Sequence, residues 1–432
     1  MIACRTADDA WVSNTSPSEI IAGASAKATY SQIFRIREFS AVFIAHVVSM
    51  LGNIVADVAL TVLVYQRTHS PALAASTMTL MFLPYLLGGS FLSSAAARWR
   101  TRRTLVVCDV ASAVIVFVMA TPHLPVAVIL GLLFVLGLIA PIFQGVRAAT
   151  LPQILPLGPP YVLGRSVLRL VAQGSQVAGF AVGGLLLVAV SPRIALVVDA
   201  ASFVLSATVL RFGTKERRSS VVTAQRSVVH ESMRSLAAVL VHRRLRKVML
   251  IEWLVPLCAV APEALAAPYV SHLHLHSNAV GFWLTAIPVG TVVGDIVAAR
   301  LLPVVWRRRV AIPAMCLAGG SMLIFVVAPA FPMAYVLLIV IGLGAAYQPA
   351  VDQELVDAAP ADLQAAALSI NSSGLMFFQG VGFGLWGLVG EVLAPAAVVV
   401  VAGVFLLLAV LLFHPWPLLR PHAVARLDAT PA

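Results

Sequence analysis

The sequence predicts an all-α integral membrane protein with twelve transmembrane helices in two pseudo-repeated six-helix bundles. Its composition, its long apolar runs and an internal repeat carry this prediction. Hydrophobic residues make up 60% of the 432 residues and charged residues 11%, whereas an ordinary soluble domain has about 25% charged residues. The net charge of +11 is dispersed between apolar runs, so it favours membrane topology over a nucleic-acid partner.

Twelve apolar runs have about the length that a membrane-spanning helix requires, which is roughly 20 residues. In lipid each run must be helical, because only a helix satisfies its own backbone polar groups. The runs lie at 39–65, 72–97, 104–121, 124–146, 162–190, 193–212, 248–271, 279–302, 310–328, 332–351, 363–390 and 394–414.

These runs divide the chain into five parts. A cytoplasmic tail (1–38) precedes the first six-helix bundle (39–212), and a basic cytoplasmic linker with an amphipathic helix (213–247) leads to the second bundle (248–414). A second cytoplasmic tail (415–432) ends the chain. The first tail shows no signal peptide, so the first hydrophobic helix is expected to direct insertion.

The basic residues predict the orientation. With a cytoplasmic N-terminus, the outer loops hold only Arg67 and Arg193, and the other 27 of the 29 Lys and Arg residues lie at or near cytoplasmic segments. Examples are "RWRTRR" at 98–103 and "RRLRK" at 243–247. This asymmetry predicts a multi-pass protein of the inner (plasma) membrane with both termini in the cytoplasm.

The chain also repeats itself at one offset. "QVAGFAVGGLL" from Gln176 returns as "QGVGFGLWGLV" from Gln379, an offset of 203. "FQGV" at 143–146 returns as "YQPA" at 347–350, an offset of 204. Each echo places run n on run n+6, which indicates two duplicated halves of six helices.

The first run contains polar residues that lipid does not tolerate. At about 100° per residue, His46, Asn53 and Asp57 share one stripe of a helix, and Asn53 and Asp57 are close enough to hydrogen-bond. A charge at mid-bilayer costs about 3 kcal/mol, so the stripe is expected to face protein or an aqueous cavity. The alternatives are a substrate cavity, with Asp57 as a proton-coupling residue, and an Asp57 that pins two helices together.

The seventh run is the repeat partner of the first and has its own acids. Glu263 lies at a depth similar to that of Asp57 and is the second candidate for proton coupling, against a structural role. Glu252 lies close to the basic segment 243–247, so it is expected at the interface and paired there.

Polar side chains on other runs complete the candidate cavity. Gln side chains both donate and accept hydrogen bonds, which suits either substrate binding or contacts between helices. The candidates besides His46 and Asn53 are Gln144, Gln173, Gln176, Tyr347, Gln348 and Gln379.

Local motifs resemble a known family. "VVSMLGNIVADVALTVLVYQRTHSPALAAS", "LPYLLGGSFLSSAAARWRTRRTLVVCD" and "VRAATLPQILP" resemble the first four helices of bacterial multidrug, macrolide and siderophore exporters of the major facilitator superfamily. The resemblance covers about residues 36–415. It implies the twelve-helix fold, a cavity lined by helices one, four, seven and ten, and transport rather than enzymatic chemistry.

The resemblance also implies a cytoplasmic gate, at which this chain departs from the family pattern. The usual Gly-x-x-x-Asp-Arg-x-Gly-Arg-Arg has Ser93 for the Gly and Ala97 for the Asp, and residues 361–390 contain no Arg or Lys. Both sides of the usual ionic lock are therefore missing. The gate candidates that remain are Arg98, Arg102, Arg103, Arg147 and Arg300.

The predicted function is secondary active transport, as proton-coupled efflux of small, fairly apolar compounds by an antiporter. The expected partners are the substrate, protons and the bilayer, with a monomeric chain and no nucleic acid, metal or cofactor. The absence of a Gly-Lys-Ser/Thr phosphate loop argues against ATP-driven transport. The alternatives are an importer or symporter, a non-transporting receptor or degenerate relative, and a channel.

Overall fold

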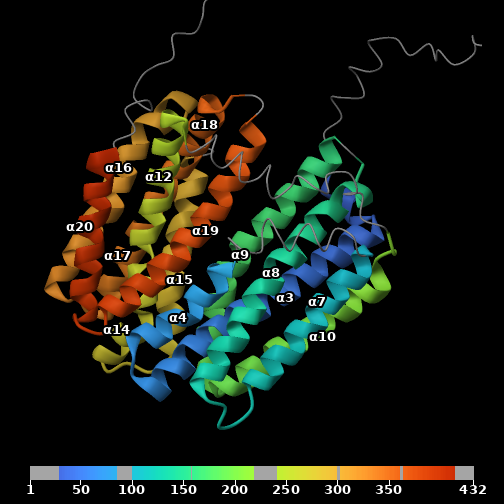
Figure 1. Ribbon diagram of the computed structural model, residues 1–432, viewed down its shortest axis with the longest axis horizontal. Coiled ribbons are helices and arrows are strands. Elements are labelled where there is room, and N and C mark those ends of the chain that lie inside the picture. Colours follow the sequence, from blue (N-terminus) through green and yellow to red (C-terminus); the bar gives the residue numbers. More distant parts are fainter. Residues whose placement is uncertain are drawn as a thin grey trace, which may run out of the picture.

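The computed structural model describes residues 29–84, 100–156, 158–217, 241–298, 302–360 and 363–413. Within these ranges the secondary structure is almost entirely helical, and the helices gather into two groups that lie side by side (Figure 1). The gate candidates Arg98 and Arg300 lie outside the described residues, as do most of the two tails.

The first group holds the helices before the linker. They are α2 (Tyr30–Phe34), α3 (Arg37–Thr68), α4 (Pro71–Phe82), α7 (Thr101–Met119), α8 (Val126–Ile154), α9 (Pro159–Ala189) and α10 (Pro192–Gly213).

The second group follows the linker. It consists of α12 (Arg243–Ala259), α13 (Ala261–Ala264), α14 (Ala266–His272), α15 (Asn278–Ile296), α16 (Val304–Leu323), η3 (Ile324–Val327), α17 (Phe331–Leu343), η4 (Gly344–Tyr347), α18 (Gln348–Ala358), α19 (Gln364–Val389) and α20 (Pro395–Phe413).

Ten helical segments in the described ranges are long and apolar enough to cross a membrane. Helices α4 and α7 take the places of the second and third predicted runs. The description of α4 stops shortly after Phe82, and α7 is less apolar because it carries Arg102, Arg103 and Asp109. The fold is therefore the predicted all-α membrane fold of two six-helix bundles.

Two membrane segments of the second bundle are broken, and each break is explained by sequence. The seventh segment divides into α12, α13 and α14 around Pro262, which cannot donate a backbone hydrogen bond. The tenth divides at η4, and Pro349 lies in the first turn of α18. A break inside a membrane requires other partners for the freed backbone groups. Trp386 and Trp283 supply them, donating indole N–H bonds of 2.7 and 2.8 Å to the carbonyls of Leu257 and Pro262.

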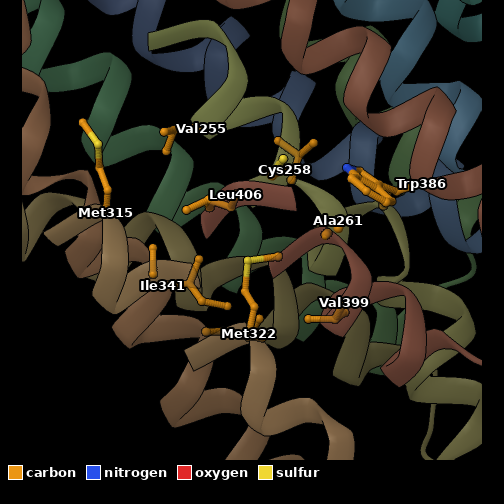
Figure 2. Close-up of a cluster of buried hydrophobic side chains, with 14 of the residues drawn as sticks. Val255, Cys258, Ala261, Met315, Met322, Ile341, Trp386, Val399 and Leu406 are labelled. Atoms are coloured by element: carbon orange, nitrogen blue, oxygen red, sulfur yellow. The ribbon is translucent and has the colours of Figure 1, made fainter. Parts of the chain in front are cut away.

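The core of the second bundle is a continuous apolar cluster. Side chains of α12, α16, α17, α19 and α20 meet there, and Met315 and Met322 of α16 belong to the same cluster as Val255 of α12 and Leu406 of α20 (Figure 2). Both methionines are fully buried. This packing holds the broken seventh segment against its neighbours.

The most extensive contacts between the two bundles are those of α4 with α19 and of α9 with α15. Gly184 of α9 and Gly281 of α15 let the backbones meet, since a Cβ added at Gly281 would lie 2.2 Å from the Cα of Gly184. At the same end of the molecule, Glu391 accepts hydrogen bonds from the hydroxyl of Ser70 and, at 3.0 Å, from the amide of Ala72 at the start of α4. The contacts thus join the ends of the helices that the predicted topology places outside.

Candidate functional site

A cavity of about 400 Å³ lies between the two bundles, within the usual range for sites that bind small molecules. Helices α3, α4 and α9 line it from the first bundle, and α12, α13, α15, α16, α17, η4, α18 and α19 line it from the second. No residue of α8 is among those lining it. The fourth membrane helix, which the resemblance implies as a cavity helix, does not contribute to this cavity in the conformation described.

The wall of the cavity is mainly apolar and aromatic. Phe82 of α4 and Phe383 of α19 stack across the bundle boundary with ring centroids 5.8 Å apart, and Phe180 comes from α9. Met78 and Met376 add flexible side chains, which adapt to ligands of different shape. Such a wall suits compounds with a large apolar body.

Six of the predicted site residues lie on this wall. Asp57 and Gln176 come from the first bundle, and the second bundle adds Glu263, Tyr347, Gln348 and Gln379. The cavity therefore holds one carboxyl group from each bundle.

The position of Asp57 follows from the face that α3 turns to the cavity. Ile54, one turn earlier, lines the cavity with it, while the opposite face packs against α10. The hydroxyl of Thr61, one turn later, donates a hydrogen bond of 2.8 Å to the backbone carbonyl of Asp57. Asn53 makes no hydrogen bond to the Asp57 side chain among the described residues, so the predicted pairing is absent here.

Glu263 reaches the cavity because the seventh segment breaks. It belongs to the four-residue α13 between Val260 and Leu265, and Val260 lines the cavity with it. Half-helix ends near the midplane are a common place for binding sites in transporters. Tyr347 occupies the corresponding position at the end of η4 in the tenth segment.

His46 and Arg147 contact one another rather than the cavity. Arg147 Nη1 donates a hydrogen bond to His46 Nδ1, which places the ring proton on Nε2 because an arginine only donates. His46 is buried, and the Arg147 guanidinium lies 6.0 Å from the centre of the Phe143 ring. A predicted cavity residue and a predicted gate residue thus form one contact between α3 and α8.

The remaining predicted residues fall elsewhere. Gln144 is exposed and outside the cavity lining, and Gln173 has its backbone within α9. Arg102 of α7 forms an ion pair of 3.2 Å with Glu216, which lies just after the end of α10. Arg103 is exposed.

The sequence analysis missed two buried acids of the first bundle. Asp199 of α10 is completely buried and accepts a hydrogen bond of 3.1 Å from the Ser202 hydroxyl. Its Oδ2 atom has no hydrogen-bond partner among the described residues. Asp109 of α7 accepts a hydrogen bond of 2.6 Å from the Ser206 hydroxyl. The spacing of Asp199, Ser202 and Ser206 along one helical face was the available signal.

Glu252 also differs from expectation. It is 3% exposed, and among the described residues it forms no ion pair. Arg244 of the basic segment bonds Glu354 instead, and Arg308 lies 3.9 Å from the same carboxylate. The prediction of an interfacial Glu252 paired with that segment is wrong.

Comparison with known proteins identifies the family. A model of the major facilitator type, described as transmembrane secretion effector, matches residues 28–430. The chain belongs to the transmembrane secretion effector family. No curated protein matches it.

Solved structures show the same fold at low identity. A bacterial homologue of the lysosomal transporter Spinster, in an inward-facing and unoccupied conformation, is 13% identical with a TM-score of 0.68, over 90% of this chain and 98% of that chain. A peptide transporter POT is 12% identical with a TM-score of 0.69, over 93% and 98%. The nucleoside transporter NupG is 13% identical with a TM-score of 0.66, over 87% and 98%.

Family and fold together establish the class of protein. The protein is a multi-pass membrane protein and a secondary transporter of the major facilitator superfamily, built from two six-helix bundles.

Proposed function

We propose that this secretion effector exports small, largely apolar compounds across the inner membrane in exchange for protons. The observation that carries the proposal is the single cavity that holds Asp57 from one bundle and Glu263 from the other. A carboxyl group inside a membrane is costly to ionise, so each acid is suited to bind a proton when the cavity closes around it.

The coupling follows from alternating access. In major facilitator proteins the bundles rock about a site near the midplane, which opens to one side at a time. Protons that arrive from outside neutralise Asp57 and Glu263. Substrate that arrives from the cytoplasm competes for the same polar wall, so exchange is obligatory. His46, Asn53, Gln144 and Gln173 belong to the proposed path between this wall and the cytoplasm.

The conformation described suits loading from the cytoplasm. Contacts between the bundles join the ends that the predicted topology places outside, at Gly184 with Gly281 and at Ser70 with Glu391. The cytoplasmic gate of the proposal uses Arg98, Arg102, Arg103, Arg147 and Arg300 in place of the usual Asp–Arg lock. The family description, secretion, favours export.

Uptake by inside-out membrane vesicles tests this function. A proton gradient is imposed, and accumulation of a panel of amphiphilic fluorescent dyes is followed with and without an uncoupler. We expect saturable, uphill uptake that the uncoupler abolishes and that vesicles without the protein lack. Three outcomes contradict the proposal. Uptake confined to right-side-out vesicles indicates an importer, and passive, non-saturable flux indicates a channel. The absence of flux for every dye indicates a receptor.

A further inference from the structure

A ring of polar residues lies one helical turn beyond the cavity, on four helices of the second bundle. Residues four apart lie one turn apart on the same face of a helix. Each of four cavity-lining residues has such a partner on the side away from the outer contacts. The pairs are Pro256 with Glu252 in α12, Thr291 with Asp295 in α15, Gln348 with Asp352 in α18 and Leu375 with Asn371 in α19.

The helix directions place these four residues at one level. Helices α12 and α19 run toward the cavity from this end, whereas α15 and α18 run away from it. The side chains also come close to one another. The Glu252 carboxyl lies beside the amide of Asn371 and within electrostatic reach of Asp352. The Tyr347 hydroxyl lies beside the amide of Gln348 and within electrostatic reach of Glu252, Asp352 and Asp295.

Two buried oxygen atoms of this ring, and a third on the cavity residue Tyr347 beside it, are not satisfied at normal hydrogen-bond geometry. Glu252, Tyr347 and Asn371 are 3%, 2% and 5% exposed. Their Oε2, Oη and Oδ1 atoms form no hydrogen bond of normal geometry within the described part of the chain. An unpaired buried polar atom costs about 1–3 kcal/mol, and three together indicate that a bound group completes them.

The position of these oxygens is held by packing. The indole N–H of Trp253 donates a hydrogen bond of 3.2 Å to the backbone carbonyl of Asn371. The Trp253 ring stacks on the Phe378 ring, with the ring centroids 5.2 Å apart. Two arginines of the same bundle are engaged elsewhere, because Arg244 bonds Glu354 and Arg308 bonds Asp357 at 2.5 Å.

The chemistry of the missing group follows from the three atoms. A carboxylate oxygen and an amide oxygen accept hydrogen bonds, and a phenol oxygen accepts as well as donates. A protonated amine is cationic and carries up to three N–H donors, so it matches all three. Tyr347 also lines the cavity, so a molecule with its amine in the ring has its apolar body against Phe82, Phe180 and Phe383.

We propose that Glu252, Tyr347 and Asn371 form a subsite for the protonated amine of the substrate, so that the transported compounds are amphiphilic amines. This inference rests on the proposed transport function and specifies its substrate class. The subsite is separate from both Asp57 and Glu263, so the amine and the protons bind to different carboxyl groups. The apolar body of the substrate still occupies the cavity that Asp57 and Glu263 line, so substrate and protons compete there.

Equilibrium binding to the purified full-length protein in detergent tests the subsite without any gradient. The probe is dansylcadaverine, a fluorescent dansyl group on a pentyl chain with a primary amine, and its neutral match is N-pentyl dansylamide. We expect the wild-type protein to prefer the amine. Glu252→Gln should weaken amine binding about 30-fold or more, as expected for loss of one partner of a buried charge pair, and change binding of the neutral probe by less than about 2-fold.

Two further variants control for folding and charge. Tyr347→Phe removes one hydroxyl without changing the packing, and should weaken the amine probe about 5-fold; it tests the subsite even when Glu252→Gln does not fold. Asp357→Asn removes a carboxylate of α18 that pairs with Arg308, and should leave both probes unchanged.

Several outcomes overturn the proposal. Equal affinity of the wild-type protein for both probes means that Glu252 holds only a proton. Loss of amine preference in Glu263→Gln instead of Glu252→Gln moves the cation to the cavity acid. Displacement of the amine by millimolar Na⁺ but not by choline at equal ionic strength indicates an inorganic cation site. If the protein does not bind the amine, the subsite is rejected, but proton-driven export of other compounds still stands. If the protein binds the amine but shows no gradient-driven uptake, the transport mechanism alone is rejected.

Discussion

Gly281→Ala should weaken the contact that closes the outer side of the transporter. A methyl group at this position would lie 2.2 Å from the Cα and 2.4 Å from the backbone nitrogen of Gly184, so helices α9 and α15 must separate by about 1.5 Å to reach ordinary contact distance. Backbone atoms cannot move aside as a flexible side chain does. Overpacking of this kind costs about 1–3 kcal/mol, which is a shift of about 5- to 150-fold in a two-state equilibrium.

The strain acts only in the state in which the two helices touch, so the equilibrium should move toward a state that is open on this side. Double electron–electron resonance measures this with spin labels at Thr121 and Ala330, which are exposed at the outer ends of the two bundles. We expect a new, longer distance in Gly281→Ala. Gly174→Ala on α9 is the matched control, because its added methyl group meets nothing within 4 Å. An unchanged distance distribution in Gly281→Ala, or an equal change in both variants, refutes the reasoning.

Two further predictions concern charged side chains at the ends of helices. Glu391→Ala removes the carboxylate that accepts a hydrogen bond from Ser70 at the start of α4. Since a charge at a helix N-terminus contributes about 0.3–1 kcal/mol, labelling of a cysteine placed on the outer side should rise about 2- to 5-fold. Unchanged labelling contradicts a closing role for Glu391. Arg244→Leu leaves the fully buried Glu354 with only Arg308 at 3.9 Å, so the unfolding free energy should fall by about 3 kcal/mol. Adding Glu354→Gln should restore most of the lost thermal stability, and a double variant no better than the single one counts against the pair.

Helical periodicity predicted which residues share a face, but not which neighbour that face meets. His46, Asn53 and Asp57 lie on one stripe of α3, as expected for residues about three turns apart. Of these, Asp57 lines the cavity, while His46 meets Arg147 of α8. The stripe is long enough to pass from the bundle boundary into the interior of the first bundle, and the sequence contains no signal for where that change occurs.

The breaks in the seventh and tenth segments were the other feature beyond sequence analysis. Pro262 and Pro268 were visible, but a proline inside a membrane helix produces either a kink or a full break, according to the partners that its neighbours offer. Trp386 donates a hydrogen bond to the Leu257 carbonyl from α19, which is 129 residues further along the chain. Glu252 was misjudged for a related reason, because Arg244 prefers Glu354 from α18.

The measurement that tests the central claim most directly is pH-gradient-driven flux per folded molecule in reconstituted vesicles, comparing the wild-type protein with Asp57→Asn. The substitution keeps size and hydrogen bonding but cannot exchange a proton. A dye identified in the vesicle screen is the probe, and its binding is measured in parallel. The account predicts that Asp57→Asn binds the dye, loses uphill transport and shows a flat pH dependence, with a similar or milder defect in Glu263→Gln. Full coupling in the surviving Asp57→Asn molecules, with only their abundance reduced, would show that Asp57 is structural and would contradict the account.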